Sequence, residues 1–384
     1  MPGLDAIVVG LGAMGSAAVF HLADAGARVL GIDRLVPPHT FGSSHGDTRI
    51  TRLAVGEGRQ YVPLVRRSHE LWDELAAECG TTLRVQCGGL VMGAVTTTSM
   101  HGVDDFTVAT IEVARSNAIP HDLLDADEIR TQFGVFNTTD ETGLLEHTAG
   151  YLYAEECVRA HLDGAARRGA ELRTAEIVVK WSATDAGVTV TTEQASYEAG
   201  SLVLAAGPWL PELAPELAHL FSVERQTMLW FSTQGRDAEF RGLPVWIWHH
   251  GRYPGDYAYG FPSVDGPGGG AKCATETYGQ PTTPADVDRV VQPAEVATFF
   301  DRHVKGRLSG LGPMSTRAEV CLYTVTPDHG FVIDRHPEHD NVVIASPCSG
   351  HGFKHSAAVG ECVAALATSG NPAVDLSGFR LERF

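Results

Sequence analysis

The sequence predicts an α/β fold, α+β overall, in which a Rossmann-like nucleotide-binding domain is interleaved with a second domain built on a largely antiparallel sheet. Three observations predict it. A strand, a glycine-rich turn, a helix and a second strand follow one another at the start of the 384-residue chain. Two later apolar runs end in small residues, as the first strand does. Between them lie short, aromatic-rich runs bounded by turn residues, which are typical of antiparallel strands.

The start of the chain has the pattern of a βαβ unit. Residues Ala6–Val9 predict a strand, and the glycine-rich turn and Ala-rich stretch that follow predict a helix reaching Ala25. In such a turn the first glycine allows a sharp bend, the second lets the backbone approach a pyrophosphate, and the third allows close helix packing. The turn residues expected to contact a nucleotide are Gly10, Gly12, Ala13, Met14 and Gly15.

The second strand ends in an acidic residue. Arg28–Ile32 predicts this strand, and Asp33 directly after it is placed to accept hydrogen bonds from an adenosine ribose. We expect the neighbouring Arg34 to contact the same cofactor. A pyrophosphate at the positive end of the helix completes the prediction of a dinucleotide site. NAD and FAD share this fingerprint, so the βαβ unit leaves both open.

The remaining elements divide between the two domains. Gln60–Ala77 has apolar residues at helical spacing and predicts an amphipathic helix. The apolar runs Leu202–Gly207 and Val342–Ser346 resemble the first strand and are expected to rejoin its sheet. The strands expected in the second, largely antiparallel sheet are Gln226–Ser232, Val245–His250 and Asp256–Phe261. The nucleotide-binding domain is therefore expected to comprise residues 1–85, 145–220 and 320–384, and the substrate domain residues 86–144 and 221–319.

Composition excludes several classes of function. A net charge of -18 argues against extended contact with nucleic acid or an anionic membrane, because both need a basic surface. The seven dispersed cysteines lack C-x-x-C spacing, which disfavours a disulfide framework and a zinc site, and no other spacing suggests a metal. No apolar run is long enough for a membrane span or a signal peptide, so we expect a soluble, cytoplasmic protein.

Two polar motifs lie within the predicted nucleotide-binding domain. The segment 42–52, GSSHGDTRITR, follows the βαβ unit and has the composition of a loop that faces a cofactor. Near the C-terminus, residues 349–354 (SGHGFK) precede a predicted helix of small residues from Ser356 to Ala367. The start of that helix offers unpaired N–H groups to an anion, and a reduced flavin carries negative charge.

Together these motifs resemble the monomeric sarcosine oxidase and N-methyltryptophan oxidase family. The resemblance rests on the Gly10 motif, the S-S-H-G-D-T-R-x-x-R segment, the C-L-Y-T run at 321–324 with T-P-D after it, and S-G-H-G-F-K, in this order. It extends nearly over the whole chain, including the ending 379–384 (FRLERF). It implies FAD as cofactor, held covalently by Cys321 through an 8α-S-cysteinyl thioether. Cys348, which the family pattern does not usually contain, is the second choice for attachment.

The resemblance also implies roles for individual residues. Arg52 and Lys354 match the pair that holds the substrate carboxylate, and Arg49 is expected beside the flavin ring, where it favours the anionic form. The alternative is that Arg52 and Lys354 are solvated surface charges and that Arg49 contacts a phosphate or the backbone. The further residues expected to contact FAD are Gly42, Ser43, His45, Thr48, Arg49, Cys321, Gly350, Gly352, Phe353 and Lys354.

Four more site residues are expected, three from the second domain and Tyr323 from the nucleotide-binding domain. Lys272 matches the lysine that activates oxygen, with a solvated loop lysine as the alternative. Tyr259 and Tyr323 match tyrosines that wall the amine. The family has a histidine where this chain has Glu276. A carboxylate there favours a cationic head group on the substrate, unless Glu276 turns outward into water.

The implied reaction is the oxidation of a secondary-amine amino acid, sarcosine or another N-methyl amino acid. A hydride passes to the flavin, the imine hydrolyses, and O2 reoxidises the flavin to give hydrogen peroxide. The alternatives are a cyclic imino acid of the pipecolate or proline type, or a biosynthetic amine intermediate. An NAD-dependent dehydrogenase and a non-catalytic flavin-binding module are the rivals of another class. We expect a monomer or a simple homo-oligomer whose partners are the amino acid and O2.

Overall fold

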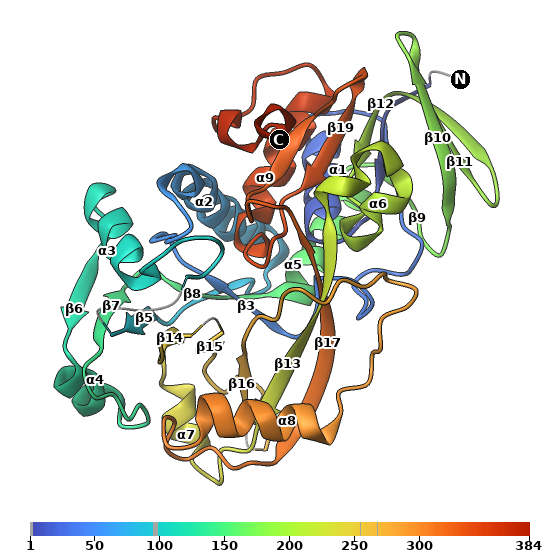
Figure 1. The fold of residues 1–384 in the computed structure, drawn as a ribbon. Helices are drawn as coiled ribbons and strands as arrows, with labels where there is room; N and C mark the ends of the chain where they lie inside the picture. Colours follow the sequence, from blue (N-terminus) through green and yellow to red (C-terminus); the bar gives the residue numbers. More distant parts are fainter. Residues whose placement is uncertain (1–2, 95–98, 254, 267) are drawn as a thin grey trace.

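The chain folds around two large sheets and a small one, as Figure 1 shows. The structure is a computed structural model, and it describes residues 3–94, 99–253, 255–266 and 268–384. The predicted mixed α/β fold class, with a Rossmann-like sheet and a largely antiparallel second sheet, is confirmed. No helix in these ranges is long and apolar enough to cross a bilayer.

The first sheet has eight strands and a parallel centre. β1 pairs in parallel with β2 and β12, and β12 pairs in parallel with β19. Both later apolar runs are therefore strands of the sheet that contains the first strand, as predicted. The strands are β1 (Leu4–Val9), β2 (Val29–Ile32), β9 (Glu171–Arg173), β10 (Val178–Thr184), β11 (Gly187–Thr192), β12 (Ser196–Leu204), β18 (Val332–His336) and β19 (His339–Ser346).

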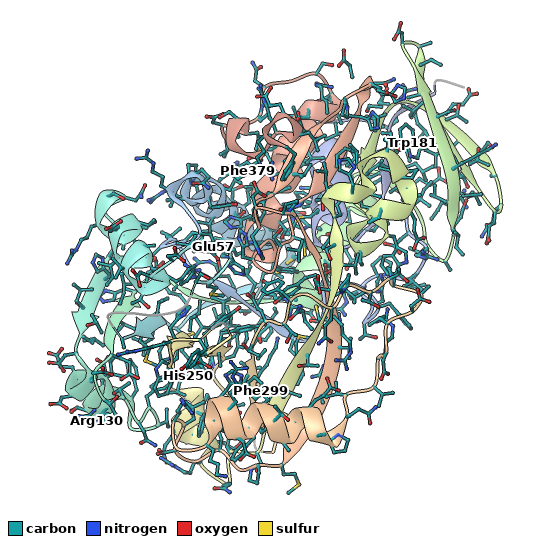
Figure 2. The ribbon with its side chains drawn as sticks, in the orientation of Figure 1. Glu57, Arg130, Trp181, His250, Phe299 and Phe379 are labelled. Carbon is teal, nitrogen blue, oxygen red and sulfur yellow. The ribbon has the colours of Figure 1, made fainter. Side chains whose placement is uncertain are left out.

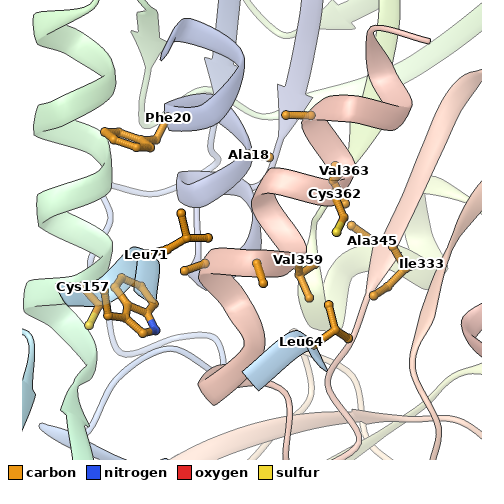
Figure 3. Close-up of a cluster of buried hydrophobic side chains, with 14 of the residues drawn as sticks. Ala18, Phe20, Leu64, Leu71, Cys157, Ile333, Ala345, Val359, Cys362 and Val363 are labelled. Carbon is orange, nitrogen blue, oxygen red and sulfur yellow. The ribbon is translucent and has the colours of Figure 1, made fainter. Parts of the chain in front are cut away.

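Helices of small residues pack closely beside the first sheet. A Cβ added at Gly360 would overlap Ala17, so the two helices that carry these residues approach almost backbone to backbone. Figure 3 shows Ala18, Val359 and Val363 in this interface. The helices are α1 (Ala13–Asp24), α2 (Val62–Cys79), α5 (Ala154–Arg167) and α9 (Ser356–Ala367), with short 3-10 turns at Arg59–Tyr61 and Phe353–His355 leading into α2 and α9.

The second sheet is antiparallel except where β14 lies parallel to β5. Aromatic side chains fill the core on one side of it, where Phe231 stacks on Phe299 at a centroid distance of 5.7 Å. The strands, in the order in which they pair, are β17 (Ser315–Val325), β13 (Ser222–Phe231), β16 (Ala271–Ala274), β15 (Tyr257–Gly260), β14 (Val245–His249), β5 (Gly89–Gly93), β7 (Thr142–Glu146) and β6 (His121–Leu124). The helices beside it are α3 (Phe106–Ser116), α4 (Ala126–Phe133), α7 (Asp237–Arg241) and α8 (Pro293–Phe299).

A small sheet lies between the two large ones (Figure 1). It consists of β3 (Thr48–Thr51), β8 (Gly150–Tyr153) and β4 (Arg84–Gln86), all antiparallel. β3 is the later part of the polar segment 42–52. The motif that follows the βαβ unit in sequence is therefore held between the two large sheets. The short α6 (Leu210–Leu213) follows β12 along the chain.

Candidate active site

One cavity runs from the glycine-rich turn to the S-G-H-G-F-K loop. Its walls come from both large sheets and from β3. Three of the expected site residues, Gly15, His45 and Thr48, do not line it. Those that do are Gly10, Gly12, Ala13, Met14, Asp33, Arg34, Gly42, Ser43, Arg49, Arg52, Tyr259, Lys272, Glu276, Cys321, Tyr323, Gly350, Gly352, Phe353 and Lys354.

The nucleotide end has the geometry that the glycine pattern predicts. Gly10 has φ +89°, and a Cβ there would lie 2.5 Å from the carbonyl oxygen of Ala205. A Cβ on Gly15 would overlap the carbonyl oxygen of Gly10, so the third glycine serves helix packing and not ligand contact. The N-terminus of α1 opens on the cavity through Gly12 and Ala13. These features fit the pyrophosphate of a dinucleotide.

Asp33 is fixed at this end by the turn itself. Its Oδ2 accepts a hydrogen bond of 2.7 Å from the Leu11 N–H, and its Oδ1 accepts one of 2.8 Å from the Leu35 N–H. Burial raises the pKa of the carboxyl, although these hydrogen bonds oppose the shift. Arg34 lies over the Trp209 ring at 5.1 Å and also lines the cavity. Each Asp33 oxygen keeps a lone pair for a ribose hydroxyl.

The Cys321 thiol lies among cations in the middle of the cavity. Arg49 Nη2 is 3.8 Å from its sulfur and donates to the Ser43 carbonyl oxygen at 3.0 Å. Burial alone raises the pKa of a thiol, but the neighbouring His45 and the charge of Arg49 bring the pKa of Cys321 below its usual value. His45 is itself paired with Glu319, and the distance from its Nδ1 to Glu319 Oε2 is 3.2 Å.

Cys348 also lines the cavity but has a different environment. Its sulfur accepts a hydrogen bond of 3.3 Å from the Thr324 N–H. Burial raises the pKa of this thiol above its usual value. Of the two cysteines that the sequence offered for attachment, Cys321 is therefore the one whose thiolate is favoured. The described cysteines are all free of disulfides, as their spacing predicted.

Lys272 is buried, with 3% of its surface exposed, which excludes the solvated-loop alternative. It lies on β16, and its Nζ donates to the carbonyl oxygens of Gly46 and Thr48 at 2.6 and 2.8 Å. The ammonium also lies 4.6 Å from the centroid of the Phe261 ring. Burial, followed by the charge of Arg49, lowers the pKa of this lysine well below its usual value. Lys272 thus joins the second sheet to the start of β3.

Arg52 and Lys354 meet at a buried carboxylate that the sequence analysis did not single out. Arg52 Nη2 donates to Glu57 Oε2 at 2.8 Å, and its Nη1 donates to the Ala54 carbonyl oxygen. Lys354 Nζ donates to the His351 carbonyl oxygen at 2.7 Å and lies 3.9 Å from Glu57 Oε1. Glu57 lies in the interior of the molecule (Figure 2). The two cations thus lie on either side of one buried anion.

Glu276 does not turn outward, because only 6% of its surface is exposed. Its carboxylate pairs with His101 Nε2 at 2.9 Å and accepts hydrogen bonds from the hydroxyls of Tyr257 and Tyr278 at 2.8 and 2.9 Å. His101 Nδ1 lies 3.3 Å from Glu57 Oε1. A chain of charged groups thus connects Glu276 with the carboxylate between Arg52 and Lys354.

The hydroxyls of the two predicted tyrosines meet in the wall of the cavity. The hydroxyl oxygens of Tyr259 and Tyr323 are 3.3 Å apart. Burial raises the pKa of both phenols, and the negative charge of Glu276 adds to the shift of each. Both side chains therefore stay neutral at physiological pH. They form an uncharged, aromatic wall with hydrogen-bonding tips.

Sequence reasoning missed Glu57 and His101. Glu57 lies between Gly56 and Gly58, a few residues after Arg52, which was a signal for a tight turn beside the motif. His101 and Gly102 are a turn dipeptide whose significance is visible only in the tertiary contact with Glu276. In the described ranges no cluster of His, Cys, Asp and Glu is arranged to hold a metal ion.

Comparison with known proteins agrees with this architecture. Residues 5–366 match the family described as FAD dependent oxidoreductase. The chain is 42% identical to a monomeric sarcosine oxidase of Streptomyces avermitilis, over 100% of this chain and 98% of that protein. It is 34% identical to an N-methyl-L-tryptophan oxidase of Yersinia pestis, over 99% of each.

Solved structures share the fold. NikD, described as an unusual amino acid oxidase essential for nikkomycin biosynthesis, superposes with a TM-score of 0.85 at 23% identity and covers 99% of this chain and 98% of its own. Glycine oxidase from Geobacillus kaustophilus superposes with a TM-score of 0.79 at 20% identity and covers 99% of each chain. The chain is therefore an enzyme of the FAD-dependent oxidoreductase family, in the group that contains the monomeric sarcosine oxidases and N-methyl-L-tryptophan oxidases.

Proposed function

We propose that this enzyme oxidises a secondary-amine amino acid, sarcosine or another N-methyl amino acid, and produces hydrogen peroxide. The observation that carries the proposal is the convergence of Arg52 and Lys354 on one buried anion in the cavity that also contains the glycine-rich turn. Relatives named for N-methylated substrates, at 34 to 42% identity, support the same substrate class.

The two cations would hold the substrate carboxylate. A guanidinium can grip both carboxylate oxygens, and an ammonium adds a mobile charge. Lys354 has three N–H donors and uses one of them on the His351 carbonyl oxygen. Arg52 already donates a hydrogen bond from one nitrogen to Glu57, so the substrate carboxylate would compete with Glu57 for this guanidinium. Binding of this kind fixes the amine relative to the aromatic wall formed by Tyr259 and Tyr323.

FAD fits the other half of the cavity, and when bound it would accept a hydride from the carbon beside the amine and return the electrons to O2. Arg49 supplies a fixed positive charge there, because its donors are held by the carbonyl oxygens of Thr48 and Ser43. In its protonated form Lys272 uses two donors on backbone carbonyl oxygens and has a third N–H for the cavity. We infer that Lys272 stabilises the negative charge that develops on oxygen.

We also propose that the flavin is attached through the sulfur of Cys321. Support comes from the lowered pKa of this thiol, which contrasts with the raised pKa of Cys348. The thiolate is the reactive form of cysteine, so Cys321 has the environment that attachment requires.

An anaerobic bleaching screen of the purified, yellow enzyme tests the proposed function. N-methyl amino acids and cyclic imino acids are added in turn, and loss of flavin absorbance in the blue reports oxidation. N-acetylglycine is the matched control, because it keeps the carboxylate and lacks a basic amine. Bleaching by an N-methyl amino acid but not by the control is expected. A colourless protein, or a yellow one that no secondary-amine amino acid bleaches, contradicts the proposal.

Three expectations about the protein as a whole accompany the proposed function. We propose the discontinuous division into residues 1–85, 145–220 and 320–384 around FAD and residues 86–144 and 221–319 around the substrate. We also propose a cytoplasmic location and a monomer or simple homo-oligomer. A cyclic imino acid is distinguished from an N-methyl amino acid by the same screen.

A further inference from the structure

Five charged side chains form one buried cluster at the substrate end of the cavity: Arg52, Glu57, His101, Glu276 and Lys354. They alternate in sign, since Glu57 lies between Arg52 and His101, and His101 lies between the two carboxylates. All five line the cavity. A Cβ added at Gly350 would lie 2.8 Å from Glu276 Oε1 and 3.0 Å from His101 Nε2, so this pair lies directly against the S-G-H-G-F-K loop.

A tight turn places His101 in this cluster. The backbone N–H groups of Met100 and Val103 each donate to the carbonyl oxygen of the other residue at 3.0 Å. His101 and Gly102, the two central residues, have φ of +51° and +77°. A left-handed conformation is uncommon for a residue with a Cβ and persists where surrounding contacts hold it. Here the two carboxylates and the His351 ring, whose centroid is 4.8 Å away, hold the imidazole.

The cluster has three cations and two anions. Burial lowers the pKa of a histidine, but Glu276 and Glu57 raise the pKa of His101 to about 9. Burial raises the pKa of a carboxyl, but Arg52 brings the pKa of Glu57 well below its usual value, and His101 lowers that of Glu276. The pKa of Lys354 is lowered to about 8 by burial. At pH 7 both carboxylates are therefore ionised and all three basic groups are protonated.

The remaining titratable groups around His101 are neutral at this pH. Burial lowers the pKa of His351 well below its usual value, and it also lowers the pKa of His329, whose ring centroid is 6.3 Å from that of His101. Burial raises the pKa of Tyr257 and Tyr278, the two phenols that donate to Glu276. One positive charge in the cluster is thus left without a partner.

We propose that the Glu276–His101 pair sets the charge of the substrate, so that the site accepts one carboxylate on a molecule whose amine is bound in its neutral form and whose side chain is uncharged. This inference rests on the proposed function and deepens it. A single substrate carboxylate balances the unpartnered positive charge, whereas a second carboxylate or a cationic side chain leaves a net charge in a buried site. The expectation that Glu276 favours a cationic head group is therefore replaced, because His101 cancels its charge.

Ligand binding to the oxidised holoenzyme tests this charge rule without turnover. Propionate and succinate differ by one carboxylate, and their Kd values are measured at pH 7 and low salt from flavin absorbance changes or by calorimetry. The wild-type enzyme is expected to prefer propionate by at least about tenfold. Glu276→Gln adds a net positive charge and is expected to shift the preference toward succinate by at least about tenfold. His101→Asn removes a positive charge, tolerates the left-handed turn, and is expected to weaken propionate binding by about tenfold or more.

Tyr278→Phe is the matched control, because it removes a hydrogen bond to Glu276 and no charge. Its preference between the two ligands should stay within about twofold of the wild type. An unchanged preference in Glu276→Gln overturns the inference. If Glu276→Gln does not retain flavin, the inference is overturned by unchanged propionate affinity in His101→Asn. If neither variant retains flavin, it is overturned by equal affinity of the wild-type enzyme for propionate and succinate. Wild-type enzyme that shows the expected preference but oxidises no secondary amine contradicts the proposed function alone.

Discussion

Replacing Lys354 with Met should stabilise the fold while weakening the substrate site. The pKa of Lys354 is lowered from 10.5 to about 8 by burial, which at 1.36 kcal/mol per pKa unit corresponds to about 3 kcal/mol. Between pH 8 and 10.5 the unfolded chain binds more protons than the folded one, so the stability of the wild type rises with pH in this window. Below pH 8 the full cost of the buried ammonium is present. The Met variant should gain up to about 3 kcal/mol at pH 7 and lack this pH dependence.

The same variant should lose carboxylate affinity. A hydrogen bond between charged groups contributes roughly 1.5–3 kcal/mol, so KM for an N-methyl amino acid should rise roughly 10- to 100-fold. The contact is present in both ground state and transition state, so kcat should change little. In the wild type KM should rise as pH passes through about 8, because the ammonium then loses its proton. That rise should disappear in the variant.

Two assays together distinguish the expected effects on stability and KM from a general loss of folding or activity. Chemical denaturation gives the free energy of unfolding, and peroxide release between pH 6.5 and 9.5 gives kcat and KM. Lys180→Met is the matched control, since Lys180 is an exposed lysine on β10. It should alter neither quantity. A Lys354→Met enzyme that is less stable than the wild type, or whose KM is unchanged, refutes the reasoning.

Four further variants address the flavin end. Lys272→Met should slow reoxidation of the reduced enzyme by orders of magnitude and spare anaerobic flavin reduction, as followed by stopped-flow absorbance; equal oxygen reactivity refutes the assignment. Cys321→Ser should leave no yellow colour in acid-precipitated protein, whereas Cys348→Ser should keep it, and the reverse result moves the attachment to Cys348. Gly15→Ala should yield protein without flavin, because the new Cβ overlaps the Gly10 carbonyl oxygen; normal flavin content in this variant would contradict the packing argument.

The βαβ unit was predictable because its signals are local. The glycine pattern, the Ala-rich helix and Asp33 follow from conformational freedom and from periodicity along a single stretch of chain. The structure has the predicted turn and helix, and in it Asp33 accepts a hydrogen bond from the Leu11 N–H. The return of β12 and β19 to the same sheet was also visible, because buried parallel strands have a recognisable apolar composition.

The catalytic half of the site was predictable only through resemblance to known motifs. Arg52 and Lys354 are far apart in sequence, and neither has a local feature that distinguishes it from a solvated cation. The environment of Glu276 was outside the reach of the sequence, since its partner His101 belongs to a turn with no motif of its own. The place of Glu57 in the site is evident only from the structure, in which the two cations lie on either side of it.

By itself the sequence determined the nucleotide-binding unit, the class of fold and the residue types available for chemistry, because these depend on backbone conformation and on the spacing of apolar side chains. Tertiary structure alone decided the ionisation states and the charge balance of the substrate end. The reason is physical: the pKa of a buried group depends on which charges lie within a few ångströms of it, and those neighbours come from distant parts of the chain.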